Sequence, residues 1–313
     1  MSKSVLPQAF VIVATKGRTR EMVGLFDSLA RQSLLPIRVA VVGSEAADIQ
    51  GLEMHELALS GRAILKTSPT AGTCIQRNVG LNMLADEIRA SEPTQTFLVF
   101  FDDDFRPADD WLEQCARSFA EQLDVVGITG DVISDGVRVS GYNEAEAAQY
   151  ISGERPREPH WPHNGQRHDM RGGGLYGCNM AYRGNAALSV RFDEALPLYG
   201  WQEDIDFAAR VAAFGRLIFE PACRGVHMGV QGARTSGLRF GYSQIANPVY
   251  LIRKGSMRWR FGFRLAARNV ASNLFNTLRA NRSKDYAGRL RGNAIALLDA
   301  LRWRQHPMRV LEL

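Results

Sequence analysis

Short, uninterrupted apolar segments that alternate with helix-like segments constrain the fold of this chain more than any other feature. The segments at 9–15, 37–43 and 97–101 read AFVIVAT, IRVAVVG and FLVFF. Such runs are typical of parallel strands, because these strands are buried on both faces. The residues at 19–29 and 72–90, which lie between them, have the spacing of helices. The alternation predicts an α/β fold with a mixed, mainly parallel sheet flanked by helices.

The charges of the chain are divided unevenly along its length. Residues 1–250 contain 24 Lys and Arg against 30 Asp and Glu, whereas residues 251–313 contain 14 against 3. Helical spacing at 256–281 and 284–304 predicts basic amphipathic helices, which favour an anionic membrane surface as a partner. The alternative is a helical hairpin that covers the rest of the protein, with its arginines in solvent. No recognised nucleic-acid motif accompanies the charge, so a nucleic-acid partner is not expected.

The composition excludes several classes of protein. Hydrophobic residues make up 45% and charged residues 23%, as in an ordinary globular protein and unlike a collagen-like or disordered one. The start of the chain lacks the long apolar segment of a secretory signal, so we expect a cytoplasmic protein. The four cysteines are spaced singly, which predicts free thiols without a zinc site.

Three consecutive acids, Asp102, Asp103 and Asp104, directly follow the apolar segment at 97–101. They repel one another, and the carboxyl end of a parallel strand is where ligands bind in α/β folds. A divalent cation held with a diphosphate would neutralise them, because carboxylate oxygens suit Mg²⁺ and Mn²⁺. The alternative is a solvated turn before the next helix.

Three further segments carry candidate functional residues. Glu203 and Asp204 open a helix-like segment, either as simple capping residues or as a general base at the edge of a cleft. Arg77 lies near the start of the helix at 72–90, either on the surface or in contact with a phosphate. His227 lies in a Gly-flanked loop after the acidic motifs, and this order favours a metal or phosphate role.

These motifs, in this order, resemble the inverting family 2 glycosyltransferases of the GT-A fold. The resemblance spans about residues 9–229. It rests on VIVATKGR, AGTCIQRNVGL, FLVFFDDDFRPADDWLE, the GCNMAYRGNAAL and YGWQEDIDFAARVAAFG segments, and the late His227.

The resemblance implies a nucleotide-sugar donor and a divalent metal, Mn²⁺ or Mg²⁺. It implies that Asp204 is the general base with Glu203 beside it, and that Asp104 and His227 hold the metal. Family members often place an Asp after the second strand to read the base, where this chain has Gly43, Ser44 and Glu45. The donor-binding residues implied are Thr15, Lys16, Arg18, Glu45, Arg77, Asp102 and Asp103.

We therefore expect a Rossmann-type, GT-A-like catalytic domain over residues 1–245, with a donor half at about 1–130 and an acceptor half at about 131–245. A basic helical extension is expected over 246–313. The expected activity is transfer of one sugar, with inversion, to a glycan or lipid-linked acceptor, in the cytoplasm or peripherally on the inner face of the membrane. The alternatives are a sugar-phosphate nucleotidyltransferase and a catalytically silent subunit that binds carbohydrate or nucleotide.

Overall fold

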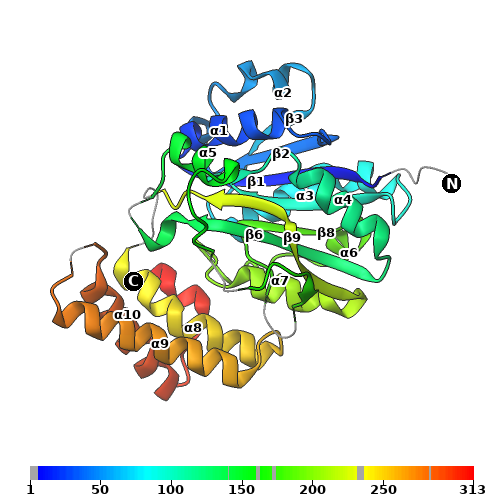
Figure 1. Cartoon of the computed structure of the whole chain (residues 1–313). Coiled ribbons are helices and arrows are strands. Elements are labelled where there is room, and N and C mark those ends of the chain that lie inside the picture. Colours follow the sequence, from blue (N-terminus) through cyan, green and yellow to red (C-terminus); the bar gives the residue numbers. More distant parts are fainter. Residues whose placement is uncertain (1–5, 140, 160–162, 171–173, 231–235, 282) are drawn as a thin grey trace.

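The computed structural model describes residues 6–139, 141–159, 163–170, 174–230, 236–281 and 283–313. A sheet with helices on both faces forms the body of the protein, and a group of three long helices lies at one end (Figure 1). The strands are β1 (Gln8–Thr15), β2 (Arg38–Gly43), β3 (Ala63–Thr67), β4 (Thr96–Asp102), β5 (Phe105–Pro107), β6 (Val125–Asp135), β7 (His168–Asp169), β8 (Asn179–Arg183) and β9 (Arg216–His227). The α-helices are α1 (Thr19–Ala30), α2 (Glu56–Leu59), α3 (Thr73–Arg89), α4 (Trp111–Glu121), α5 (Glu144–Ser152), α6 (Gly184–Leu188), α7 (Glu203–Val211), α8 (Gly237–Lys254), α9 (Trp259–Leu278) and α10 (Tyr286–Leu301).

The strands form one mixed sheet in the order β3-β2-β1-β4-β8-β6-β9-β5, and β7 pairs with β9 off this path. The three predicted apolar strands are β1, β2 and β4, and both β2 and β4 run parallel to β1. β8 is antiparallel to its neighbours β4 and β6. The expectation of a mixed, mainly parallel sheet is thus confirmed, and the carboxyl ends of β1, β2 and β4 meet at one edge.

The sheet buries both of its faces because successive side chains of a strand point to opposite sides. Val11 and Val13 of β1 pack in one core with residues of α1 and α4. Phe10 and Ile12 of the same strand pack in a second core with residues of α3 and α7. A polar residue at any of these positions would lie in one core or the other, which explains why the run is apolar without interruption.

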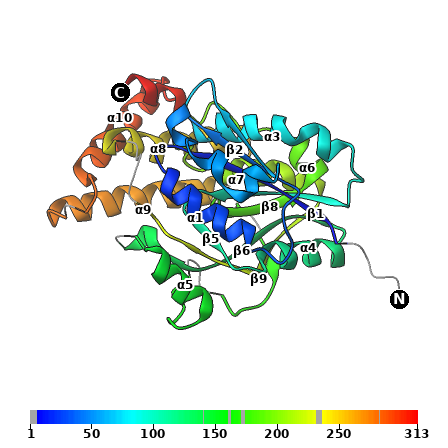
Figure 2. The same cartoon turned by 90° about the horizontal axis from the view of Figure 1, so that it is seen from above.

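Helices α8, α9 and α10 lie together at the end of the molecule away from the N-terminus in both views (Figures 1 and 2). The boundary expected at residue 245 falls inside α8, a continuous helix that also packs on the body of the protein through Leu251. α8 and α10 approach closely at Gly292, where a Cβ atom would lie 2.1 Å from the carbonyl oxygen of Leu238. No helix among the described residues is long and apolar enough to cross a membrane.

The structure corrects the position expected for His227. This histidine ends the long strand β9 and does not lie in a loop. The apolar spacing at 175–182 also predicts a strand, but β8 begins only at Asn179, because the preceding residues turn and the Asn179 amide donates to the carbonyl of Tyr176 (3.0 Å).

The four cysteines are buried and free, as predicted. The sequence also predicts long loops between 134 and 174, and parts of these lie outside the described residues.

Candidate active site

The acidic triplet lies where the sheet places it, at the carboxyl end of β4 beside the end of β1. Asp103 and Asp104 are buried, with 4% and 2% of their surface exposed. The Thr15 hydroxyl donates to Asp103 (2.8 Å). The Arg18 guanidinium donates to Asp103 (2.9 Å) and lies 3.3 Å from an Asp104 oxygen. Four of the predicted donor-side and metal-side residues are therefore one connected cluster, and the reading of the triplet as a solvated turn is wrong for Asp103 and Asp104.

The two buried acids of this cluster differ in protonation. Burial and the negative charge of Asp104 raise the pKa of Asp103 to about 7, although Arg18 opposes the rise. Burial also acts to raise the pKa of Asp104, but His227 and Arg18 outweigh it and hold the value at about 2. The Asp104 carboxylate is therefore ionised at neutral pH, as a metal ligand must be.

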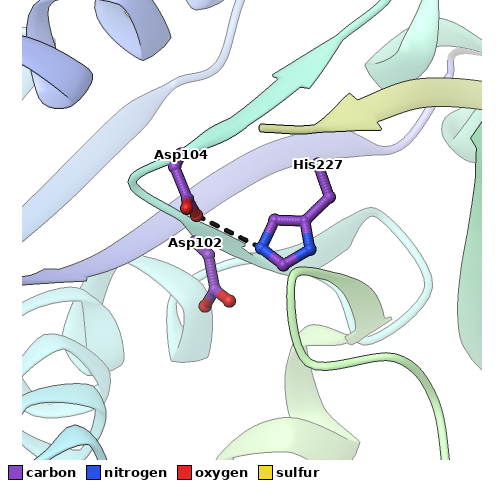
Figure 3. A group of neighbouring side chains, drawn as sticks. All are labelled: Asp102, Asp104 and His227. Atoms are coloured by element: carbon purple, nitrogen blue, oxygen red, sulfur yellow. Dashed lines mark ion pairs between the residues drawn. The ribbon is translucent and has the colours of Figure 1, made fainter. Parts of the chain in front are cut away.

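Asp102, Asp104 and His227 form a candidate metal site. Each offers one ligand atom, and these atoms lie within 4.8 Å of one another. Figure 3 shows the Asp104 carboxylate directed at the His227 ring, where Asp104 Oδ1 lies 3.3 Å from Nε2. Oδ1 of Asp104 is buried, and the His227 ring is its charged neighbour. Two carboxylates and one imidazole whose ligand atoms lie this close together fit a divalent cation such as Mn²⁺ or Mg²⁺.

His227 is oriented by two residues that the sequence analysis did not select. Its Nδ1 lies 3.0 Å from Asp135 Oδ1, and the Tyr176 hydroxyl donates to Asp135 Oδ2 (3.1 Å). Burial acts to lower the pKa of His227, but Asp104 and Asp135 outweigh it and raise the pKa well above the ordinary value. A carboxylate behind a histidine fixes the ring so that its other nitrogen can face a metal. One signal could have found Asp135, because it ends a strand, β6, as Asp102 ends β4.

The predicted catalytic pair lies at the first turn of α7. Two left-handed residues precede it, Gly200 and Gln202, with φ of 67° and 74°. The Gly177 amide donates to Asp204 Oδ2 (3.1 Å), and the Ile205 amide donates to Oδ1 (2.8 Å). These two donors hold the carboxylate at the helix start, where it is partly exposed to solvent.

Glu203 points into the protein, beside Asp204. Burial and the charge of Asp204 raise the pKa of Glu203 to about 8, although Arg77 opposes the rise. Burial also raises the pKa of Asp204. Groups whose pKa is shifted towards neutrality by burial and a like charge are typical of acid–base sites.

Arg77 joins the two acidic motifs. It is 2% exposed, and its two terminal nitrogens donate to Glu203, to Asp102 (2.9 Å) and to the carbonyl of Gly177 (3.0 Å). The reading of Arg77 as a surface residue is therefore wrong. Its direct contact with a nucleotide stays a prediction, because protein acceptors engage both terminal nitrogens here.

The remaining predicted donor residues, Lys16 and Glu45, lie exposed on the loops after β1 and β2. A buried carboxylate that the sequence analysis missed, Asp48, joins these loops. It accepts hydrogen bonds from the amides of Gly17 (2.6 Å), Ser44 (2.7 Å) and Glu45 (3.0 Å). Asp48 thus holds together the two loops that carry Lys16 and Glu45.

Comparison with known proteins places this site in context. The sequence pattern of the family described as Glycosyl transferase family 2 matches residues 10–192. The mannosyltransferase PcManGT from Pyrobaculum calidifontis, in complex with GDP-Man and Mn²⁺, has a TM-score of 0.52 and 17% identity, over 98% of this chain and 86% of that chain. S. aureus TarS has a TM-score of 0.51 and 17% identity, over 78% of this chain and 40% of that chain. No curated protein matches the sequence. At these identities the two structures show a shared GT-A fold.

Proposed function

Because the chain belongs to glycosyl transferase family 2, we propose that it transfers a single sugar, with inversion, from a nucleotide-sugar donor to a glycan or lipid-linked acceptor. The observation that carries the proposal is the Arg77 bridge. It joins the group of Asp102, Asp104 and His227 to Glu203, which lies beside Asp204 at the start of α7. This contact supports a diphosphate site and a base site that act together.

The donor is proposed to lie over the ends of β1, β2 and β4. Asp104 and His227 would hold Mn²⁺ or Mg²⁺, which when bound neutralises the charge of a diphosphate. Asp102 and Asp103, with Thr15 and Arg18, would bind the sugar and ribose side of the donor. The loops that carry Lys16, Glu45 and Arg77 complete the proposed donor site. The complex of PcManGT with GDP-Man and Mn²⁺ supports a donor and a metal of this kind.

The proposed chemistry is one direct displacement. The acceptor hydroxyl oxygen bonds to the anomeric carbon while the bond from that carbon to the diphosphate oxygen breaks, and the nucleoside diphosphate leaves with the bonding electron pair. Asp204 accepts the proton of the hydroxyl as general base. The nucleophile enters opposite the leaving group, so the configuration at the anomeric carbon inverts. Glu203, held by Arg77, positions the turn that carries Asp204.

The substitution Asp204→Asn tests this assignment. We expect turnover to fall by roughly 10²–10⁴-fold, the usual contribution of a general base, while donor affinity stays nearly unchanged. A thermal-shift screen of nucleoside diphosphates and nucleotide sugars with Mn²⁺ or Mg²⁺ first selects the donor, because a ligand of the folded state raises its apparent stability. Transfer is then followed by release of nucleoside diphosphate, and donor affinity by calorimetry.

The exposed Asp109→Asn is the matched control and should behave as wild type. Near-normal turnover of Asp204→Asn would exclude Asp204 as the base. Release of pyrophosphate from a nucleoside triphosphate would instead identify a nucleotidyltransferase, and donor binding without any turnover would identify a silent binding subunit.

We also propose that the protein works in the cytoplasm, at the inner face of the membrane. The support is the charge of residues 251–313, where 14 basic residues stand against 3 acidic ones. Basic segments are attracted to anionic lipid over about a Debye length, roughly 8 Å at physiological salt.

A further inference from the structure

Helix α9 has the reverse of the usual distribution of side chains. Its only fully buried residues are Gly262 and Asn273. Several of its large apolar residues are exposed, with Phe263 58% exposed and Leu278 78% exposed, although Val270 packs against the core of α8 and α10. Helices of globular proteins normally turn such residues towards the core. The basic helix expected over 256–281 has two alternative uses, contact with a membrane or cover for the rest of the protein, and Phe263 and Leu278 do not serve as cover.

The buried side of α9 is held by amides. The Asn273 side chain donates to Gln244 of α8 (2.8 Å) and to Asn293 of α10 (2.8 Å). Asn293 in turn donates to the carbonyl of Gly241 (2.6 Å). Close backbone approach and buried amide hydrogen bonds can join helices without a large apolar contact, as they do in bilayers. These hydrogen bonds hold the three helices together with a small apolar contact from α9, in which Val270 packs against the core of α8 and α10.

We define the outer face of α9 by the exposed apolar residues that share one side of the helix: Trp259, Phe263, Ala267, Leu274 and Leu278. α10 also exposes a large apolar residue, Leu301, 78% of which is accessible, although its Ala296 is buried. At 1.5 Å per residue the 20 residues of α9 give a face about 30 Å long. Exposed apolar stretches of this size mark sites of protein or membrane contact.

Charge decides between these two kinds of partner. Arg260, Arg264 and Arg268 recur every four residues beside the outer face, and all three are exposed. Of the three acidic residues after residue 250, Asp299 is buried and bound to Arg309 and the Tyr242 hydroxyl. A second copy docked on this face would bring two arginine rows together, whereas anionic lipid headgroups would neutralise them.

We propose that the outer face of α9 inserts into the interfacial region of an anionic bilayer, with the arginine row against lipid phosphates. A helix with an apolar face that includes Trp and Phe and a basic polar face is typical of this mode of binding. Insertion adds burial of apolar side chains to the electrostatic attraction, so the contact is stronger than charge alone gives.

The bilayer contact is mechanically connected to the catalytic pair through α8. Lys254 of α8 pairs with Asp206 of α7 (2.9 Å), and the Asn247 side chain donates to the carbonyl of Trp201 (2.8 Å). The turn that carries Asp204 is thus fixed relative to the helices that face the membrane. If the proposed function is correct, the acceptor is anchored in the same bilayer. The contact between α9 and the bilayer does not depend on the proposed function.

Co-sedimentation of the full chain with vesicles of phosphatidylglycerol and phosphatidylcholine tests the proposal. We expect binding at low salt that weakens at high salt. The triple variant Phe263→Ser, Leu274→Ser, Leu278→Ser should bind at least about tenfold more weakly, because it loses apolar burial. The triple variant Arg260→Glu, Arg264→Glu, Arg268→Glu should not bind. All six positions are exposed, so both variants should fold and keep the circular dichroism of the wild type.

Matched controls use exposed residues of the body. Met54→Ser with Leu59→Ser, at positions 72% and 70% exposed, should bind as wild type does, and so should Lys66→Glu, Arg89→Glu, Arg117→Glu. Wild-type binding by the serine variant would overturn insertion. Equal binding to neutral vesicles would overturn the role of the arginines. A dimer in sedimentation velocity that the serine variant abolishes would identify a second copy as the partner instead.

The proposed function is tested by a separate measurement. Asp204→Asn should bind vesicles as wild type does while it loses transfer. A wild-type protein that binds anionic vesicles but releases no nucleoside diphosphate from any donor would disprove the proposed function. It would not contradict the proposed contact between α9 and the bilayer.

Discussion

At the scale of single residues, Arg77 shows how the site is held together. Its guanidinium lies beside the paired rings of Phe100 and Phe192, at 5.7 and 5.3 Å from their centroids. Both terminal nitrogens donate to carboxylates of the two acidic motifs. Removing one partner of a buried ion pair is strongly destabilising, because an unpaired charge stays inside the protein. Arg77 therefore has a structural role whatever it contributes to binding.

The metal site gives the prediction that belongs to this scale. We expect Asp104→Ala to remove the Mn²⁺ dependence of nucleoside diphosphate binding, because it deletes an ionised carboxylate from the group of Asp102, Asp104 and His227. Calorimetric titration with and without Mn²⁺ measures this, and circular dichroism checks the fold.

Asp86→Ala, at a fully exposed carboxylate, is the control and should keep metal-dependent binding. Should Asp104→Ala retain the same difference between titrations with and without Mn²⁺, the group of Asp102, Asp104 and His227 would not be the metal site.

At the scale of elements, the contact between α8 and α10 depends on two glycines. A Cβ atom at Gly241 would lie 2.1 Å from the carbonyl oxygen of Arg289, and one at Gly292 would lie 2.1 Å from that of Leu238. In both cases the obstacle is backbone, which cannot move aside as the end of a flexible side chain can. The two helices can therefore pack at this distance only because neither position carries a side chain.

We expect Gly292→Ala to destabilise the protein by about 1–3 kcal/mol, the usual cost of overpacking. The change also improves helix propensity by roughly 1 kcal/mol. A net loss of stability would therefore show that the steric clash with the α8 backbone outweighs this gain. Urea unfolding followed by circular dichroism measures the free energy. Ser272→Ala, on the exposed side of α9, is the control and should change it by less than about 0.5 kcal/mol. A stabilised Gly292→Ala would contradict the close approach of α8 and α10.

At the scale of the whole molecule, α8 belongs both to the body and to the C-terminal helices. Towards the body, Tyr250 and Lys254 bind Asp193 at 2.8 and 2.5 Å. Towards the C-terminal helices, Tyr242 packs in a core with residues of α10 and the final 3₁₀ turn. The domain boundary expected at residue 245 therefore lies within a helix that packs both on the body and on the C-terminal helices.

We predict that the two units unfold together, because melting α8 removes packing from each. Urea unfolding followed by tryptophan fluorescence and by far-ultraviolet circular dichroism should give coincident single transitions. Two separate transitions would instead show that the C-terminal helices unfold independently of the body. A chain ending at residue 258 that is as stable as the full protein would show the same for residues 259–313.

The sequence by itself determined where the strands lie and which acids end them. An uninterrupted apolar run is stable only where both faces are buried, so β1, β2 and β4 followed from residue type alone. The first charged residues after such a run must leave the core, which placed Asp102 at the edge of the sheet. The motif order was sufficient to indicate the family, and the resemblance predicted Asp204 as the base.

The tertiary structure alone decided which residues meet across distances in the chain. Asp135 stands 92 residues before His227, and Glu203 stands 126 residues after Arg77, so no local pattern could pair them. The same holds for the outer face of α9. Periodicity shows that apolar residues share one side of a helix, but it does not show which side packs. In this protein Asn273 lies on the side that packs, bound to its amide partners on α8 and α10, whereas Phe263 and Leu278 lie outside.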